Sequence, residues 1–307
     1  MKRNRLILLA VLGVISLACF IYMNMHYDIL ARNTSITSAN RTLILEKLNN
    51  DQIRYIVENN IDVNIFYKYL EDDMFVFDNY RSYDKAMRVR GGSVHTVVTF
   101  VNAVSNTIDF DDILVALQYY DYATLRKMLV DHSPYNNHAE IILNPDDVSV
   151  SLNINTTIGE YEPSDLIALD HYPNIVSVDP YIQLRKECAD ALNDMCVYME
   201  SVLGSPCGGI VVSEGYVSYD SIQQNYLNAI SQYGAQMAFE MWGWPSHNEH
   251  QLGLCVDVDT VSGELLEYSV EYSYLKEIAH RYGFAFYTEA DFNHLKTPQH
   301  MRYIGRN

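Results

Sequence analysis

The stretch His250-Gln-Leu-Gly-Leu-Cys-Val-Asp257 is the most informative part of this 307-residue chain, together with His300-Met-Arg-Tyr-Ile-Gly305 near its end. His250, Asp257 and His300 offer two imidazoles and one carboxylate, a ligand set typical of a catalytic zinc site. Three protein ligands leave the fourth tetrahedral position open for water, whose pKa the metal lowers to about 7. The pattern therefore predicts a Zn²⁺ site held by these three residues.

The sequence around these ligands predicts helices and short strands in no regular alternation. Apolar residues at spacings of three or four predict a helix over 181–202, and further helices are expected over 218–234 and 272–282. Short strands are expected over 210–212, 255–259 and 301–304. Such a mixture favours an α+β fold, in which a small antiparallel sheet with flanking helices carries the zinc site.

The part of the chain before this domain is expected to be helical. Residues 34–140 carry apolar and tyrosine residues at helical spacing, and Asp109 is placed to cap a helix that begins at Phe110. The chain has 25 tyrosines, which we interpret as core and interface residues, with a glycan-stacking surface as the alternative.

The division between the helical region and the zinc domain is expected near residue 140. Beyond it, the apolar residues of 148–154 alternate with polar ones, which predicts a half-buried strand, and several prolines interrupt the same stretch. We therefore predict three parts: 1–33 as a cytoplasmic tip and membrane anchor, 34–140 as a helical membrane-proximal region, and 141–307 as the zinc domain.

The amino terminus has the pattern of a membrane-targeting segment. Lys2, Arg3 and Arg5 precede an apolar run over 6–23 that is about 27 Å long as a helix, close to the hydrocarbon thickness of a bilayer. We therefore expect an uncleaved transmembrane helix, with the remaining chain outside the cytoplasm by the positive-inside rule. Cys19 leaves a lipoprotein cleavage site as the alternative, although Ser16 stands where such a site has leucine.

The charge balance excludes nucleic acid as a partner. The net charge is −18, and removal of the three amino-terminal cations leaves −21 on the rest of the chain, which repels polyanions. Four cysteines outside the apolar run allow three pairings into two disulfides, and free thiols are the alternative. Cys188 and Cys196 share a predicted helix about 12 Å apart, so they are not expected to bond to each other.

Several motifs in this order resemble one family. Residues 213–219, Ser-Glu-Gly-Tyr-Val-Ser-Tyr, are followed by the His250–Asp257 stretch and then by the His300 motif. The region from about 160 to 307 resembles the VanY-type zinc D-alanyl-D-alanine carboxypeptidases. The resemblance implies that His250, Asp257 and His300 bind zinc, that Tyr216, Ser218 and Asn248 contact substrate, and that the substrate is the D-Ala-D-Ala end of a peptidoglycan stem peptide.

Three positions depart from the family pattern. The family's Glu-Pro-Trp-His places the general base before the last ligand, whereas this chain has Thr297 there. The family's Ser-Gly-Tyr-Arg-Ser-Tyr provides an arginine where this chain has Val217, and Asn248 stands at a serine position. No catalytic residue is therefore assigned, and Glu289, Asp291 and His294 are candidates for a replacement base. Loss of a base costs about 100- to 10,000-fold in rate.

Two functions follow as hypotheses. The first is a membrane-anchored, extracytoplasmic zinc carboxypeptidase that acts on cell-wall peptides with reduced activity. The second is a pseudoenzyme that retains zinc and binds wall peptides or a protein partner without cleavage.

Overall fold

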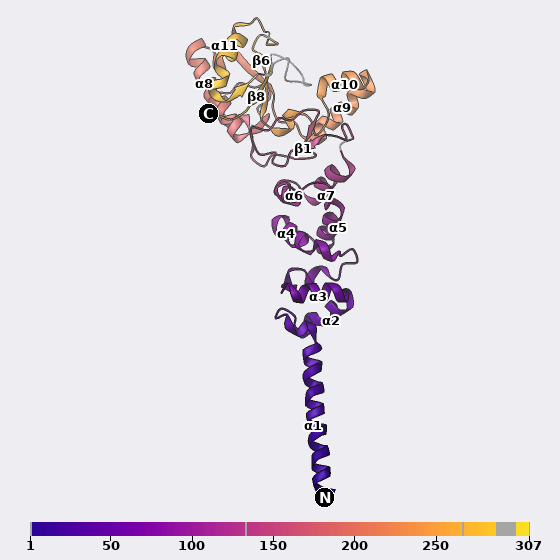
Figure 1. Ribbon diagram of the computed structural model, residues 1–307. Helices are drawn as coiled ribbons and strands as arrows, with labels where there is room; N and C mark the ends of the chain where they lie inside the picture. The colour runs from indigo at the N-terminus through magenta and orange to yellow at the C-terminus, as the bar shows by residue number, and fades with distance from the viewer. Residues whose placement is uncertain (1, 133, 266, 287–298, 307) are drawn as a thin grey trace. The chain divides into compact units, whose positions relative to one another are not determined.

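The computed structural model of the chain describes residues 2–132, 134–265, 267–286 and 299–306 (Figure 1). It divides into two compact units, Met1–Asn106 and Thr107–Asn307. Residues 107–140 therefore fold with the carboxy-terminal unit, whereas the sequence analysis grouped them with the helical region.

The first unit is helical, as its apolar spacing predicts. Its helices are α1 (Lys2–Tyr27), α2 (Ser38–Lys47), α3 (Asn50–Glu58), α4 (Tyr80–Arg90) and α5 (Val94–Val104), with short 3-10 turns between α1 and α2 and between α3 and α4. Aromatic rings fill its core: Phe66 is fully buried and packs edge-on against Phe77 and Tyr80 at centroid distances of 5.9 and 5.4 Å. Tyr69 and Tyr83 are also fully buried, which agrees with the core interpretation of the tyrosines.

Helix α1 occupies the segment that the sequence analysis interpreted as a membrane anchor. Within the part of the chain that the structure describes, no helix combines the length and the apolar character needed to cross a bilayer. The membrane anchor is therefore not confirmed.

Among the residues that the structure describes, the second unit combines helices with three small sheets. Its helices are α6 (Phe110–Ala116), α7 (Tyr122–Arg126), α8 (Lys186–Leu203), α9 (Tyr219–Tyr233), α10 (Ala235–Trp242) and α11 (Val270–Ile278). Its strands are β1 (Glu140–Ile141), β2 (Thr156–Thr157), β3 (Leu166–Ala168), β4 (Gln183–Arg185), β5 (Ile210–Glu214), β6 (Cys255–Thr260), β7 (Phe284–Ala285) and β8 (His300–Tyr303). This mixture of helices and strands confirms the α+β fold. The predicted cap of α6 is also confirmed, since Asp109 Oδ1 accepts the Asp111 amide at 2.8 Å.

The main sheet has the strand order β5-β6-β8-β7, and all neighbours are antiparallel. Alternation along each strand places Val212, Val258 and Met301, all fully buried, on one face of the sheet. The opposite face carries polar residues from β5, β6 and β8. Burial of the apolar face holds the three strands in a fixed register, and this register positions the polar groups described below.

Helix α8 is secured at its carboxyl end. Gly204 follows it with φ +74°, a left-handed conformation that glycine adopts without steric cost. A disulfide joins Cys196 in α8 to Cys207 in the next turn, whereas Cys188 and Cys255 are free and buried. The structure thus shows one disulfide and two buried free thiols where the sequence allowed either two disulfides or free thiols.

The strand predicted over 148–154 is wrong. This stretch runs as turns and irregular chain between β1 and β2. Asp147 accepts the amide of Ser149, and Asn153 accepts that of Asn155, so side chains replace strand partners locally. The carbonyls of Val148 and Val150 instead accept from the buried guanidinium of Arg302 at 3.4 and 3.0 Å. Long-range contact with one arginine therefore overrides the local alternation.

Candidate metal centre

Three carboxylate and imidazole side chains lie in one row across the main sheet. Glu214 of β5 pairs with Asp257 of β6, and Asp257 pairs with His300 of β8. Directly paired residues of antiparallel strands point to the same face, so these three side chains share the polar face of the sheet.

A 3-10 turn at Glu249–Leu252 places His250 beside this row. The Nδ1 of His250 donates to the Gly215 carbonyl at 2.7 Å, and the Val217 amide donates to the His250 carbonyl at 3.3 Å. The first contact fixes the imidazole tautomer, because a carbonyl only accepts. The Nε2 of His250 is therefore an unprotonated acceptor when the ring is neutral. It is buried and makes no hydrogen bond within the described chain.

The predicted ligands His250, Asp257 and His300 converge. One ligand atom from each lies within 4.8 Å of the others. The Nε2 of His250 is 3.5 Å from Asp257 Oδ1, and His300 Nδ1 is 2.7 Å from the same oxygen. Ligand atoms of a tetrahedral zinc site with bonds near 2 Å lie about 3.3 Å apart, which matches the first distance. The donor types and the unpartnered Nε2 therefore fit a bound Zn²⁺.

The charges of the cluster depend on one another. Burial by itself lowers the pKa of His250, but Asp257 more than offsets this, so the pKa is raised. Burial likewise opposes the charged form of His300, yet Cys255, Asp257 and Glu249 together raise its pKa well above the ordinary value. The two imidazoles in turn hold the pKa of Asp257 well below its usual range despite burial. Without metal, protons on the imidazoles therefore balance the carboxylates.

A second group of buried side chains contacts His300 on the side away from solvent. Glu249 is 3% exposed, and its Oε2 lies 3.5 Å from His300 Nε2. Its Oε1 lies 3.6 Å from Nε of the fully buried Arg302, and Cys255 Sγ lies 3.8 Å from its Oε2. Glu249, Cys255 and His300 thus form a further group of close ligand-type atoms. We interpret Glu249 as the residue that orients His300, because a buried carboxylate between two cationic groups is held in place.

The predicted substrate-binding residues lie in two segments, Tyr216 and Ser218 between β5 and α9 and Asn248 directly before the turn that carries His250. Asn248 is buried, accepts the His250 amide at 2.8 Å, and donates to the Trp242 carbonyl at 2.7 Å. Ser218 caps α9 by accepting the Ser221 amide at 3.2 Å. Tyr216 is half-buried, and burial raises its pKa to about 12. Val217 lies between them and contributes its backbone to the His250 loop. A substrate contact for these residues stays a prediction.

Thr297, which stands at the family's base position, and the candidate bases Glu289, Asp291 and His294 lie outside the described residues. Glu214 and Glu249 are site residues that the sequence pattern did not predict. Glu249 could have been predicted because it is the neighbour of the ligand His250. Nothing in the local pattern places Glu214 on the polar face of the sheet.

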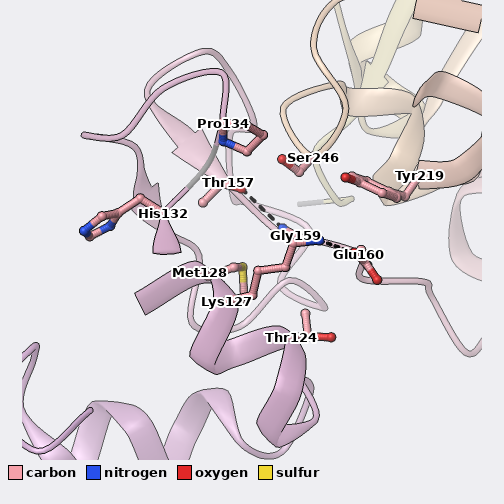
Figure 2. A pocket seen from close by; sticks show the side chains of 10 residues that line it. All are labelled: Thr124, Lys127, Met128, His132, Pro134, Thr157, Gly159, Glu160, Tyr219 and Ser246. Carbon is pink, nitrogen blue, oxygen red and sulfur yellow. Dashed lines mark hydrogen bonds and ion pairs between the residues drawn. The ribbon is translucent and has the colours of Figure 1, made fainter. Parts of the chain in front are cut away.

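A small cavity lies beside the loop that carries His250 (Figure 2). Segments 124–132 and 157–160 form most of its wall, and Lys127 Nζ binds Glu160 Oε1 at 2.7 Å. The same wall supports the ligand loop, because Gln251 Nε2 donates to the carbonyls of Gly159 and Tyr161 at 2.8 and 3.0 Å. The segment that contains Gly159 and Tyr161 is therefore part of the framework of the site.

His247, three residues before His250, is fully buried and packs its ring edge-on against Trp244 at 5.9 Å. Its role is therefore in packing.

Comparison with known proteins finds a family model and a curated relative that match the carboxy-terminal part of the chain. Residues 181–306 match the family model described as VanY, D-alanyl-D-alanine carboxypeptidase. YodJ of Bacillus subtilis (strain 168), named as a candidate carboxypeptidase, is 28% identical over 177 residues, which cover 54% of this chain and 63% of YodJ. The chain thus spans less than two thirds of that relative's length.

Solved structures of similar proteins include two peptidases. The LdcB LD-carboxypeptidase is 28% identical with a TM-score of 0.49, over 57% of this chain and 84% of LdcB. The vancomycin-resistance D,D-pentapeptidase VanY, solved in complex with Zn(II), is 19% identical with a TM-score of 0.41, over 52% of this chain and 89% of VanY.

Proposed function

Residues 181–306 belong to the VanY D-alanyl-D-alanine carboxypeptidase family, and from this premise we propose that the chain is a zinc carboxypeptidase that removes the terminal residue of peptidoglycan stem peptides. One observation carries the proposal: His250, Asp257 and His300 converge, and the buried Nε2 of His250 has no hydrogen-bond partner in the described chain. Such a ligand set suits a metal that keeps a position open for water or substrate.

When bound, Zn²⁺ supplies an electrophile that polarises the scissile carbonyl and lowers the pKa of a coordinated water. His250, Asp257 and His300 would hold the metal, and Gly215 and Glu249 contact the two imidazole rings and orient them. Asp257 remains 23% exposed in its side chain, whereas His250 is 4% exposed, so the cluster opens to solvent on the Asp257 side. A peptide is expected to approach from that side.

The direct test is release of D-alanine by the zinc-loaded protein. Two synthetic substrates are needed: a stem pentapeptide that ends in D-Ala-D-Ala and a tetrapeptide that ends in a single D-Ala after an L-centre. If D-alanine is released from the pentapeptide alone, the result supports D,D-specificity. If it is released from the tetrapeptide alone, the result supports L,D-specificity. A fully metallated protein that releases D-alanine from neither peptide contradicts the proposal.

A pseudoenzyme is the second candidate, and the residues Thr297 and Val217 favour it. Neither side chain supplies the base or the cation of the family pattern. This candidate predicts that stem peptides bind without turnover, and that Thr297→Glu creates measurable hydrolysis. Calorimetric binding of peptide together with absent D-alanine release would support it.

We also propose that the carboxy-terminal unit works outside the cytoplasm. Its proposed substrate is located there, and the disulfide between Cys196 and Cys207 suits an oxidising compartment. Protease added to intact expressing cells should then degrade this unit while a cytoplasmic marker survives. Protection of the unit until the cells are lysed would contradict this location.

A further inference from the structure

A β-bulge in β5 directs Glu214 toward the metal centre. The register pairs Val212 with Val258 and Glu214 with Asp257, so Ser213 is an extra residue on β5. In a regular ladder, Ser213 would face Asp257, and Glu214 would point to the same apolar face as Val212. The bulge reverses this alternation and brings Glu214 onto the face of Asp257.

The position of Glu214 differs from that of the other carboxylates in the cluster. Its Oε2 lies 3.9 Å from His250 Nε2, whereas Asp257 Oδ1 is nearer to this nitrogen, at 3.5 Å. Its side chain is 40% exposed, compared with 3% for Glu249. Glu214 therefore stands at the solvent-exposed side of the cluster, close to the Nε2 of His250 that makes no hydrogen bond within the described chain.

We propose that Glu214 is the carboxylate that accepts the proton of the attacking water, in place of the carboxylate that Thr297 cannot provide. This inference rests on the proposed function, because it assigns a residue to the same hydrolysis. A general base needs hydrogen-bond reach to the water and access from solvent. The bulge turns the solvent-exposed carboxylate of Glu214 toward His250 Nε2, from the strand on the far side of Asp257 from His300.

The step balances as an ordinary peptide hydrolysis. The water oxygen forms a bond to the scissile carbonyl carbon, and one water proton moves to the Glu214 carboxylate. The carbon–nitrogen bond then breaks, and Glu214 returns that proton to the leaving amine. The products are a shortened peptide acid and a free amino acid, and Glu214 regains its starting state.

The test compares Glu214→Gln with Asp220→Asn in the full chain, using both stem peptides. Glutamine has nearly the shape of glutamate but accepts no proton as a base. Asp220 is an exposed carboxylate in the first turn of α9, so its variant controls for loss of one negative charge. Zinc content, zinc affinity by chelator competition, and peptide binding by calorimetry are measured beside turnover.

We expect Glu214→Gln to lower kcat by about 100- to 10,000-fold. KM, zinc affinity and peptide affinity should stay near wild type, the pattern of a group that acts in the transition state. Asp220→Asn should leave all four quantities unchanged. Glu214→Asp keeps the carboxylate but shortens its reach, so its kcat should lie between those of wild type and Glu214→Gln.

Three outcomes overturn the inference. If wild type and Glu214→Gln hydrolyse equally, the base lies elsewhere and only this inference fails. A tenfold or greater loss of zinc affinity in Glu214→Gln would make Glu214 a metal ligand instead. If zinc-loaded wild type hydrolyses neither peptide, the proposed function fails, and the role of Glu214 fails with it.

Discussion

The carbonyl oxygen of Gly215 accepts a hydrogen bond from Nδ1 of His250 over 2.7 Å. The contact comes directly after the bulge that presents Glu214, so one local irregularity of β5 orients a proposed ligand and a proposed base. Gly215 has no room for a side chain, because a Cβ there would lie 2.6 Å from the Gln183 carbonyl oxygen and 2.8 Å from Ile182 Cγ2.

Gly215→Ala is therefore expected to displace this carbonyl and loosen His250. Loss of such a supporting contact typically weakens metal binding by about 10- to 100-fold. Chelator competition measures the affinity, and thermal unfolding of the metal-free variant separates the steric strain from the loss of zinc. Unchanged zinc affinity would show that the Gly215 carbonyl does not orient the ligand.

Replacement of a ligand should remove the metal and its stabilisation. A ligand present at about 100 times its Kd stabilises a fold by about 2.7 kcal/mol, which His250→Ala and His300→Ala should each forfeit. Elemental analysis and thermal unfolding with and without zinc measure the effect. His280→Ala is the matched control, because His280 is exposed in the turn after α11. Equal zinc content in all variants would refute the ligand assignment.

Zinc affinity should decrease as the pH falls. The pKa values of His250 and His300 are raised in the metal-free fold, so zinc has to displace protons from both rings. The decrease should begin at a pH above the ordinary histidine value of about 6.5. Titration of the metal at several pH values measures it, and an affinity that is constant down to pH 6 would contradict the expectation.

The folding stability of the metal-free protein should decrease as the pH rises, whereas zinc affinity increases. Because the folded pKa values of the two histidines are raised, their stabilising contribution is complete below about pH 6.5 and is lost as the pH rises through the raised values. Urea unfolding of the metal-free protein over this range tests the sign. In His250→Ala the pH dependence should be smaller, and an unchanged dependence would exclude His250 as its source.

The disulfide should contribute measurably to stability. Cys196 and Cys207 are 11 residues apart, and closure of a loop of this size is worth about 3 kcal/mol in the chain-entropy model. Denaturant unfolding of the Cys196→Ala/Cys207→Ala double variant should show this loss, and a reductant should destabilise wild type but not the variant. Equal sensitivity of both proteins to reductant would show that this bridge is absent in solution.

Val217→Arg tests whether the missing cation limits activity. The change adds a positive charge beside the His250 loop, where it can attract the terminal carboxylate of a stem peptide. We expect kcat/KM to rise by about tenfold or more, since a hydrogen bond between charged groups is worth about 1.5–3 kcal/mol. Val217→Gln, which adds length without charge, is the control. An equal gain in both variants would exclude the charge as the cause.

Local pattern predicted much of the second unit. The helix expected over 181–202 is α8, the strand expected over 255–259 is β6, and the closing strand is β8. These predictions succeed because each element buries an apolar stripe of its own, and the stripe has the period of the element. The residue types and order of His250, Asp257 and His300 likewise sufficed to nominate them as a ligand set.

Only the tertiary structure decided which groups meet. The stretch 148–154 has a strand's alternation, but its carbonyls bond to Arg302, more than 150 residues away. Glu214 follows the buried Val212 by two residues, which by alternation alone predicts the apolar face. Its position beside His250 depends on one extra residue in the pairing of β5 with β6. A register shift is a property of two strands together, so the sequence of one strand does not contain it.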